Sequence, residues 1–545
     1  TPTSSSAGHA SLRILPVRDD CFLVELAGLE EALALFDALE AEPIAGIREI
    51  IPAARTLLIS FDPATVNENE LANAVAARAG GERTAMSGTL VEIPVYYDGE
   101  DLAEVAGIIG TTVDDVIRMH TESEFVAAFT GFAPGFAYLS GGDPRLAVPR
   151  RKSPRTKVPA GAVGLAGEFS GIYPKNSPGG WQLIGRTPIA MFDIDRDPPA
   201  LLQPGNRVRF RNISDEPAYE IKPVAKVATN VAPAARAEGG AAAIEIVSVG
   251  LPVLFQDLGR AGEARQGICM SGAADHASLK AANRLVGNLP NSPALEIALG
   301  GLSFRVNGSC VMALTGAPAP ITITGTDGTR IAGDHHAPIA LDDGDVVTLA
   351  APTSGMRSYL AMRGGFDVAK IIGSAATDTL AQIGPSPLTA GDVVAIGRPS
   401  AGSVVSFDLP AFAMPRADET VVLDVSMGPR TDWFTEAAVE SFLSQEWSVT
   451  AQSSRVGIRL AGDALERQNH GELPSEATVR GALQVPASGQ PVLFLADHPL
   501  TGGYPVIANV ASYHLDLAGQ IPVGAKIRFN VIRSFSPRTI PGRNP

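Results

Sequence analysis

The N-terminal part of the chain combines two spacings of apolar positions. Short apolar runs typical of buried strands occupy residues 12–15, 22–26, 47–51 and 56–61. Between these runs, residues 29–41 place Leu33, Phe36 and Leu39 on one face of a helix, and residues 68–79 predict a second helix. This order of elements predicts a small α+β domain over residues 9–90.

Residues 91–222 begin with a strand and a helix and continue as a long stretch rich in glycine and proline. A strand is predicted at 91–97, and Thr112 with Asp115 forms a capping box that opens a helix over 112–119. From 129 to 188, glycine and proline recur every few residues, with aromatic and basic residues between them. Glycine allows positive φ and proline fixes φ near about −65°, so this stretch predicts short strands joined by tight turns, as in a small β-barrel or sandwich.

Residues 223–243 are the clearest linker, because alanine, proline and glycine dominate there and no periodicity survives. Beyond the linker, residues 244–410 and 411–535 carry short apolar runs between glycine turns, which predicts two further β-rich domains. One helix is expected from about residue 273 to residue 287, with Asp275 in a position that favours capping.

The two halves of the chain contain a faint repeat. PGNRVRF at 204–210 is similar to VGAKIRF at 523–529, and PGGW at 178–181 is similar to TGGY at 501–504. The separation of the two motifs is nearly the same in both halves. The repeat predicts one type of β-barrel present twice.

Composition narrows the class of protein. The chain has 545 residues, enough for about three or four domains, and its formal net charge of −15 argues against broad nucleic-acid binding. The three cysteines show no paired spacing, so neither a zinc site nor a disulfide framework is expected. No apolar run is long enough to span a membrane, and the first ten residues lack the apolar core of a signal peptide. These observations predict a cytoplasmic protein that binds no membrane.

The candidate chemistry lies in turns, because no phosphate-binding loop, dinucleotide fingerprint, nucleophile elbow or zinc-protease motif occurs. Asp497 follows an apolar strand and precedes a Gly-Gly turn, where a carboxylate can act as a base. A turn aspartate that bonds only to local backbone is the alternative. Basic residues in the glycine- and proline-rich stretch predict an anion-binding surface, with solvated charges as the alternative.

Long motifs in both halves resemble a known pair of families. The first half resembles allophanate hydrolase subunit 1-type proteins in GFAPGFAYL (131–139), VPRRKSPRTKVPAGAVGLAG (148–167) and GIYPKNSPGGWQLIGRTP (171–188). The second half resembles subunit 2-type proteins in QDLGRAGEARQGICMSGAADHASLKAANRLVGN (256–288), RSYLAMRGGF (357–366) and DHPLTGGYPVIANV (497–510). The chain therefore resembles a fusion of the two, although Ala162 stands where serine is usual. The resemblance implies a β-rich α+β fold, in which a small α/β domain precedes cyclophilin-like β-barrel domains that are duplicated between the halves.

The resemblance also implies a function. The main expectation is a fused B and C component of an ATP-dependent 5-oxoprolinase, which acts with a separate LamB/YcsF-like A subunit on a small cyclic amide or urea-like substrate. One alternative is a carboxyltransferase of the urea carboxylase type, with biotin on a partner carrier loaded by a biotin carboxylase. The other is a non-enzymatic regulator of a histidine kinase, of the Kip type. Assembly into a homo-oligomer stays open.

The expected site lies between the loop 152–181 of the first half and the loop 497–504 of the second. The residues expected to be catalytic are Asp497, Lys157 and Arg155. Those expected to bind substrate are Lys152, Ser177, Gly179, Gly180, Trp181, Gln182, Arg357, Gln484, Thr501 and Tyr504. No residue is expected to bind a metal.

Overall fold

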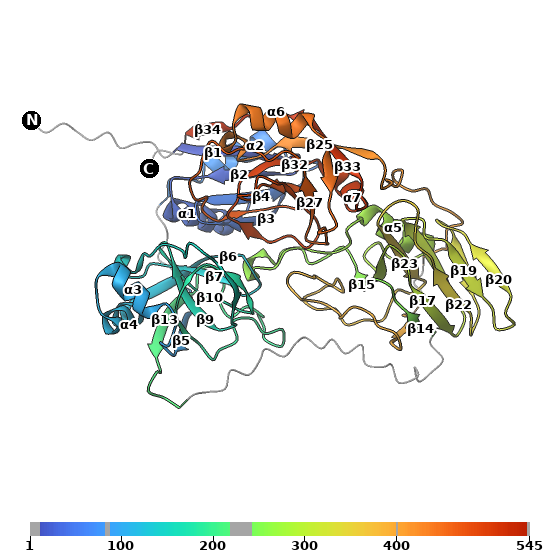
Figure 1. Cartoon of the computed structure of the whole chain (residues 1–545), viewed down its shortest axis with the longest axis horizontal. Coiled ribbons are helices and arrows are strands. Elements are labelled where there is room, and N and C mark those ends of the chain that lie inside the picture. Colours follow the sequence, from blue (N-terminus) through green and yellow to red (C-terminus); the bar gives the residue numbers. More distant parts are fainter. Residues whose placement is uncertain (1–10, 82–87, 218–241, 399–401, 542–545) are drawn as a thin grey trace, which may run out of the picture.

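Four β-rich units make up the computed structural model, which describes residues 11–81, 88–217, 242–398 and 402–541 (Figure 1). They are a small α+β domain, a first barrel, a β-sandwich and a second barrel, in chain order. The expected linker at 223–243 lies outside the described residues except for its last two positions. The β-rich α+β class expected from the sequence is confirmed.

The small domain packs two helices, α1 (Leu29–Ala41) and α2 (Glu68–Ala76), on a five-stranded sheet. Its strands, in the order β3-β4-β2-β1-β34, are β1 (Ser11–Arg18), β2 (Cys21–Glu25), β3 (Ile47–Pro52), β4 (Thr56–Phe61) and β34 (Arg538–Pro541). Helix α1 buries Leu33, Phe36 and Leu39 as its spacing predicts, whereas α2 ends three residues before the predicted boundary.

The last strand of this sheet comes from the other end of the chain. Strand β34 pairs antiparallel with β1, with Leu12 opposite Ile540, and the two strands lie side by side in Figure 1. The opposite face of the sheet, which includes Leu15 and Leu23, packs against Ala477 and Leu500 of the second barrel. Because both faces are covered, β2 is buried along its whole length.

The first barrel follows. Its helices and strands are β5 (Leu90–Val95), α3 (Leu102–Ile109), α4 (Val113–Glu122), β6 (Glu124–Thr130), β7 (Ala137–Ser140), β8 (Arg155–Val158), β9 (Ala162–Ala166), β10 (Phe169–Ile172), β11 (Ser177–Gly179), β12 (Gln182–Arg186) and β13 (Arg207–Asn212). The capping box is confirmed, since the Thr112 hydroxyl accepts a hydrogen bond from the Asp115 N–H at 3.1 Å. Helix α3 was not expected. The sheet rolls up until Tyr96 and Arg186 exchange both backbone hydrogen bonds.

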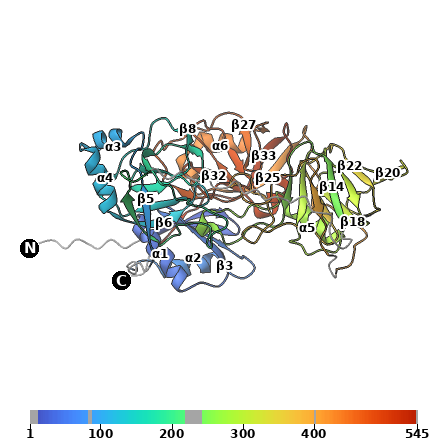
Figure 2. The same ribbon diagram turned by 90° about the horizontal axis from the view of Figure 1, so that it is seen from below.

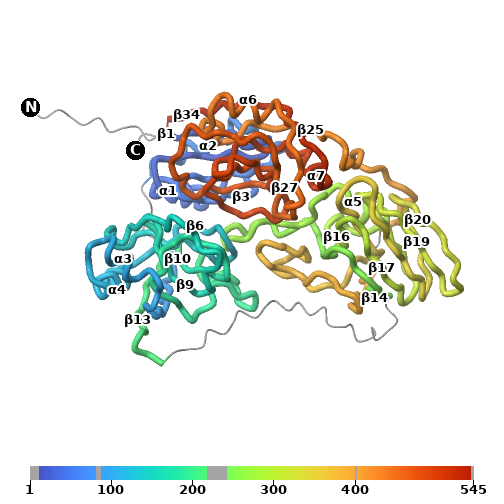
Figure 3. Tube along the Cα trace, viewed as in Figure 1, coloured from blue at the N-terminus to red at the C-terminus, as the bar shows by residue number. Residues whose placement is uncertain are grey.

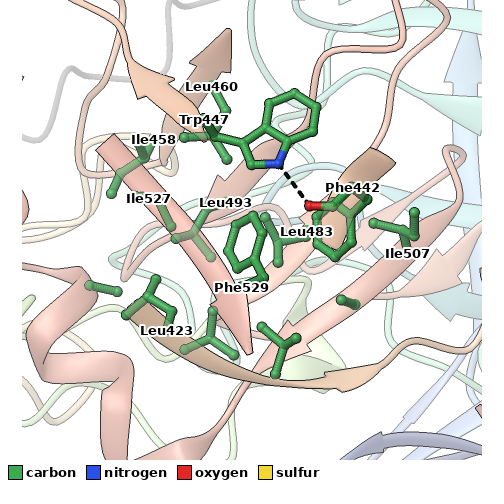
Figure 4. Close-up of a cluster of buried hydrophobic side chains, with 14 of the residues drawn as sticks. Leu423, Phe442, Trp447, Ile458, Leu460, Leu483, Leu493, Ile507, Ile527 and Phe529 are labelled. Atoms are coloured by element: carbon green, nitrogen blue, oxygen red, sulfur yellow. Dashed lines mark hydrogen bonds between the residues drawn. The ribbon is translucent and has the colours of Figure 1, made fainter. Parts of the chain in front are cut away.

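The second barrel is fully closed. Its elements are β25 (Thr420–Met427), α6 (Glu436–Ser444), β26 (Trp447–Val449), β27 (Gly457–Ala461), β28 (Glu476–Ala477), β29 (Ala482–Gln484), β30 (Val492–Phe494), β31 (Thr501–Gly502), β32 (Val506–Val510), α7 (Leu515–Ala518) and β33 (Lys526–Arg533). Figure 4 shows its core, where the Trp447 indole N–H donates to the Phe442 carbonyl at 3.0 Å and the Phe442 ring stacks on Phe529. Burying three large aromatic side chains in one cluster gives this barrel a well-packed centre.

The two barrels have the same connectivity, which confirms the repeat. The first runs β5-β13-β6-β7-β10-β9-β12 and the second β25-β33-β26-β27-β30-β29-β32, so equivalent strands appear in the same order. In both, the strand that carries the repeated motif pairs parallel with the opening strand. Each barrel also has a two-stranded ribbon, β8–β11 or β28–β31, and the Gly-Gly motif begins at the end of its second strand.

The third unit is a sandwich of two sheets. One has the order β20-β19-β22-β17-β14-β24 and the other β15-β16-β23-β18-β21. Its elements are β14 (Ala243–Ser248), β15 (Val253–Gln256), α5 (His276–Leu285), β16 (Ala294–Ala298), β17 (Ser303–Asn307), β18 (Cys310–Gly316), β19 (Ile321–Thr324), β20 (Arg330–Gly333), β21 (Pro338–Leu341), β22 (Val346–Leu349), β23 (Arg357–Met362) and β24 (Val393–Ala395). Asp275 caps α5 as expected, by accepting the Ser278 N–H at 2.8 Å.

The small domain and the second barrel lie together at the centre, with the first barrel at one end and the sandwich at the other (Figures 1 and 2). A segment that follows β23, amber in Figure 3, reaches from the sandwich toward the first barrel. There the Lys175 ammonium donates to the Leu380 carbonyl at 2.5 Å. None of the described helices is both long and apolar enough to cross a membrane.

Candidate functional site

A cavity of about 220 Å³ lies where the two Gly-Gly motifs meet. The first barrel contributes Gly179, Gly180 and Trp181, and the second contributes Thr501, Gly502 and Gly503. The repeated motifs therefore line one shared cavity from opposite sides. This is the position that the sequence predicts, between the loops 152–181 and 497–504.

Aromatic side chains form one wall of the cavity. The rings of Phe136 and Trp181 lie 5.4 Å apart in an edge-to-face arrangement, and Tyr173 and Phe132 also contact Phe136 edge-on. Burial raises the pKa of Tyr173 to about 12 and also raises that of Tyr138, so both phenols stay neutral hydrogen-bond donors. Such a wall suits the face of a small ring.

Two glycines bring the backbone close to neighbouring side chains. A Cβ atom on Gly179 would lie 2.3 Å from the Tyr173 hydroxyl, and one on Gly131 would lie 2.2 Å from the Thr501 hydroxyl. Gly131 belongs to the first barrel and Thr501 to the second. The barrels can approach this closely only because no side chain is present at residue 131.

The positive charge at the cavity comes from Arg150 and Arg151. Arg151 donates to Asp101 at 2.6 Å, and Asp101 also accepts from Arg155 at 2.7 Å and from the Leu183 N–H at 2.7 Å. Burial opposes ionisation of Asp101, but its hydrogen bond from Arg155 holds the pKa of that carboxyl below its usual value. Arg151 and Arg155 therefore both bind Asp101 and fix the segment that joins them, residues 151–155. Arg150 pairs at 3.2 Å with Glu472, and its side chain is 44% exposed.

The structure places three of the predicted residues of the first barrel outside the cavity lining. Arg155, expected to be catalytic, is occupied by Asp101 and lies outside the cavity lining. Lys157 and Lys152 are exposed and also lie outside the lining. The sequence cannot reveal this, because Asp101 lies 54 positions before Arg155.

Asp497 is completely buried and does not face an open loop. Its two carboxylate oxygens each accept from Arg455 at 2.9 Å, and they also accept from the Ser271 hydroxyl and from Thr379. Burial opposes ionisation, but the Arg455 charge and these hydrogen bonds hold the pKa of Asp497 below its usual value. The Asp497 carboxylate is therefore ionised, and both of its oxygens are occupied by Arg455, Ser271 and Thr379.

Arg357, which the sequence predicts to bind substrate, lies on β23 of the sandwich, outside the cavity lining. It is buried, pairs with Glu296 at 3.4 Å and donates to the Gly519 carbonyl. Glu296 also pairs with Arg455, so Arg357 belongs to the ionic network behind Asp497. Through the Gly519 carbonyl, Arg357 also connects the sandwich to the second barrel.

Of the other predicted residues, some line a cavity and others make hydrogen bonds to the backbone beside it. Ser177 lines a neighbouring cavity, and Gln182 is buried with its amide 3.4 Å from the Pro149 carbonyl. Gln484 donates to the Tyr504 carbonyl at 3.2 Å, so it supports the Gly-Gly turn from behind. The Tyr504 ring is half-exposed and lies under Arg467.

Sequence reasoning missed Arg150, Phe136, Tyr138 and Tyr173, all of which line the cavity. The available signal was the aromatic spacing in GFAPGFAYL. No group of three His, Cys, Asp or Glu side chains within the described ranges is placed to hold a metal ion.

Comparison with known proteins gives two family matches. Residues 12–202 match the carboxyltransferase domain, subdomain C and D, and residues 266–531 match the carboxyltransferase domain, subdomain A and B. The chain is 40% identical over 214 residues to the 5-oxoprolinase B subunit of Bacillus subtilis, with 36% of the chain and 88% of that protein covered. It is 35% identical over 289 residues to the 5-oxoprolinase C subunit of Escherichia coli, with 52% of the chain and 90% of that protein covered.

A solved protein structure matches nearly the whole chain. The crystal structure of TTHA0988 superposes with a TM-score of 0.79 at 34% identity, and the match covers 94% of this chain and 99% of that one. Both halves are therefore found joined, in the same arrangement, in another protein.

Proposed function

Since the chain belongs to the carboxyltransferase-domain family, with both subdomain pairs in one polypeptide, we propose that it is the fused B and C component of an ATP-dependent 5-oxoprolinase. The two halves are similar to the B and C subunits of that enzyme, each over most of the relative's length.

The shared cavity is the observation that carries this proposal. Its volume of about 220 Å³ lies below the ~300–1,000 Å³ typical of drug-sized ligands, so it fits a molecule of few atoms. A five-membered cyclic amide with one carboxylate matches the lining, because the aromatic wall can cover the ring and Arg150 can meet the carboxylate. Both halves are needed, because each contributes one side of the cavity.

ATP fits this cavity poorly, because a nucleoside triphosphate exceeds its volume. We place the nucleotide on the LamB/YcsF-like A subunit or at the junction with it. Phosphorylation of the amide oxygen would make the carbonyl carbon easier to attack, and that chemistry depends on positioning and charge stabilisation. In this chain, Arg150 and the aromatic wall would bind and orient the ring.

Reconstitution with the A subunit tests the function. Glutamate formation should require 5-oxoproline, ATP and both proteins. Arg150→Met should lower kcat/KM by about 10-fold or more, because a hydrogen bond to a charged ligand is worth about 1.5–3 kcal/mol. Arg145→Met is the matched control, since Arg145 is also an exposed, ion-paired arginine of the same barrel.

Two other results would contradict the proposal. Carboxyl transfer from carboxybiotin, without 5-oxoproline turnover, would indicate the urea carboxylase type of activity, which the family description also allows. Inhibition of a histidine kinase, without any turnover, would indicate the Kip type of regulator.

A further inference from the structure

A second cavity of about 140 Å³ adjoins the first, and Phe132 lines both. Its wall brings Lys175 of the first barrel together with Cys269, Asp378 and His498 of the second half. Four reactive or titratable side chains around one small cavity are more than packing requires. The question is which of them can act on a bound molecule.

The two carboxylate oxygens of Asp378 differ in their hydrogen bonds: one accepts two backbone N–H groups, and the other has only a weak thiol donor. Its Oδ1 accepts the N–H groups of Leu380 at 2.9 Å and Ala381 at 2.8 Å. Its Oδ2 meets the Cys269 thiol at 3.5 Å, and a thiol is a weak donor. Asp378 is only 1% exposed, and it takes part in no ion pair within the described part of the chain.

The next residue ties this loop to Asp497. Thr379 donates to Asp497 through its N–H at 2.9 Å and through its hydroxyl at 2.7 Å. Two buried carboxyl groups are thus held close together in different surroundings, since Asp497 is ion-paired with Arg455 and Asp378 makes no ion pair within the described ranges. Burial and then the Asp497 charge raise the pKa of Asp378 to about 6, whereas Asp497 stays ionised. Carboxyl pairs that are separated in this way divide acid and base roles between them.

We propose that Asp378 is a further catalytic residue, the proton donor of the site, and that Asp497 is a positioning residue that fixes its loop. The identity of the atom that receives the proton rests on the proposed function. A ring held against the aromatic wall of the first cavity would direct its amide end past Phe132 into the second cavity, which Asp378 lines.

In the ring opening, the C–N bond of the cyclic amide breaks while the O–H bond of Asp378 breaks and a new N–H bond forms on the leaving nitrogen. A water molecule gives its hydroxyl to the carbonyl carbon and its remaining proton to the Asp378 carboxylate. The residue is therefore restored at the end of each cycle. Because the proposed function places a phosphoryl group on the amide oxygen, C–N cleavage leaves an acyl phosphate, and a second water molecule releases phosphate from it. The net change is one water molecule added to the amide and one added to the phosphoryl group taken from ATP.

The charged and titratable groups around Asp378 are Asp497, Arg455, Cys269, Arg260, Lys175 and His498. Burial lowers the pKa of His498 to about 4 and raises that of Cys269 well above its usual value. Neither side chain changes charge near pH 6. Among the carboxyl, imidazole and thiol groups of this cavity, only Asp378 therefore changes charge near that pH.

Infrared titration of the wild-type protein and Asp378→Asn tests the protonation state without any substrate. Asparagine keeps an oxygen for the N–H groups of Leu380 and Ala381, so the loop should persist. The difference spectrum between the two proteins should contain one carboxylic-acid band at pH 5 that is lost by pH 8. Absence of that band would overturn the proposal. Asp392→Asn is the control, because Asp392 makes a similar turn to Thr389 outside the cavity.

Turnover in the reconstituted system tests the role. Asp378→Asn should still bind 5-oxoproline, as reported by Trp181 fluorescence, but kcat should fall by about 100-fold or more, and Asp378→Glu should recover part of it. A kcat within threefold of wild type would overturn the assignment. If the wild-type system does not turn over 5-oxoproline but the infrared band is present, the proposed function fails while the protonated carboxyl stands.

Discussion

The backbone N–H of Phe132 donates to the hydroxyl of Thr501 at 3.2 Å, across the junction of the two barrels. Phe132 has a φ of 65°, a conformation that costs a non-glycine residue about 1–3 kcal/mol. The strained residue lies at the boundary of the two cavities. We infer that the contact with the second barrel holds the Phe132 ring in place.

Gly131→Ala should disturb this junction. The new methyl group would meet Thr501 at 2.2 Å and push the barrels apart, so affinity for 5-oxoproline should fall by about 10-fold or more while each barrel stays folded. Calorimetric titration measures the affinity. Gly107→Ala, in α3 where a Cβ meets nothing within 4 Å, is the control and should raise stability slightly. Equal affinity in both variants would argue against the junction as the site.

Asp497→Asn should destabilise the protein. It leaves the buried Arg455 without half of its ion pairing, and removing one partner of a buried pair costs about 3–5 kcal/mol. The alternative, an aspartate on an open loop, predicts no change in melting temperature. Differential scanning calorimetry against Asp392→Asn distinguishes the two. An unchanged melting temperature would show that Arg455 finds another partner.

His120 should make the first barrel sensitive to acid. It is buried between Tyr97 and Ser170, and burial lowers its pKa to about 3, compared with about 6.5 in an unfolded chain. Between these values the unfolded state binds one more proton. Stability should therefore fall as the pH drops below about 6.5, by about 2 kcal/mol at pH 5.

Hydrogen exchange of β6 and β13 amides at pH 7 and pH 5 measures this loss. His120→Phe should reduce the difference between the two pH values, even if the variant is less stable at both. His470→Gln, at an exposed position, should keep it. If the His120 variant showed the same change in hydrogen exchange between pH 7 and pH 5 as the wild type, the acid sensitivity would come from other groups.

Lys157→Met should leave ligand affinity unchanged, although the sequence suggests the opposite. The side chain is exposed and lies outside the lining of the cavity, whereas Arg150 belongs to the lining. Direct binding of 5-oxoproline to both variants compares the two residues. If only the Lys157 variant bound 5-oxoproline more weakly, the anion would bind at Lys157, as the sequence predicts, and not at Arg150.

The two halves, produced as separate chains of residues 11–217 and 242–545, should associate. Glu25 pairs with Arg430 at 2.8 Å and Glu68 pairs with Arg533 at 2.7 Å, in addition to the β1–β34 strand pairing. Gel filtration should show one complex. Truncation after residue 533 should weaken it, because the pairing partner of β1 is lost. Halves that elute separately would mean that covalent connection holds the units together.

Local signals predicted much of the fold. Apolar spacing predicted α1, the Thr112 and Asp275 caps were correct, and a short repeat was enough to predict two barrels of one type. The fifth strand of the small domain could not be predicted, because strand pairing between opposite ends of the chain leaves no local pattern.

Only part of the site could be predicted, because some of its contacts join residues that are distant in the sequence. Glycine turns show where the backbone bends, so the Gly-Gly motifs pointed to the cavity. Charges carry no such information, since the partner of Arg155 and the partner of Asp497 are both distant in sequence. Asp378 lies in an ordinary loop, and only the packing of three units gives it an unusual environment.

The pairing of β34 with β1 also sets the order in which the protein can be completed during synthesis. The small domain leaves the ribosome before the other three units, but its sheet lacks an edge strand until residues 538–541 have been made, after both barrels and the sandwich. Until then β1 presents an unpaired edge, which is a site for pairing with other chains. A nascent chain of this protein therefore has an exposed edge to protect while the other three units are being made.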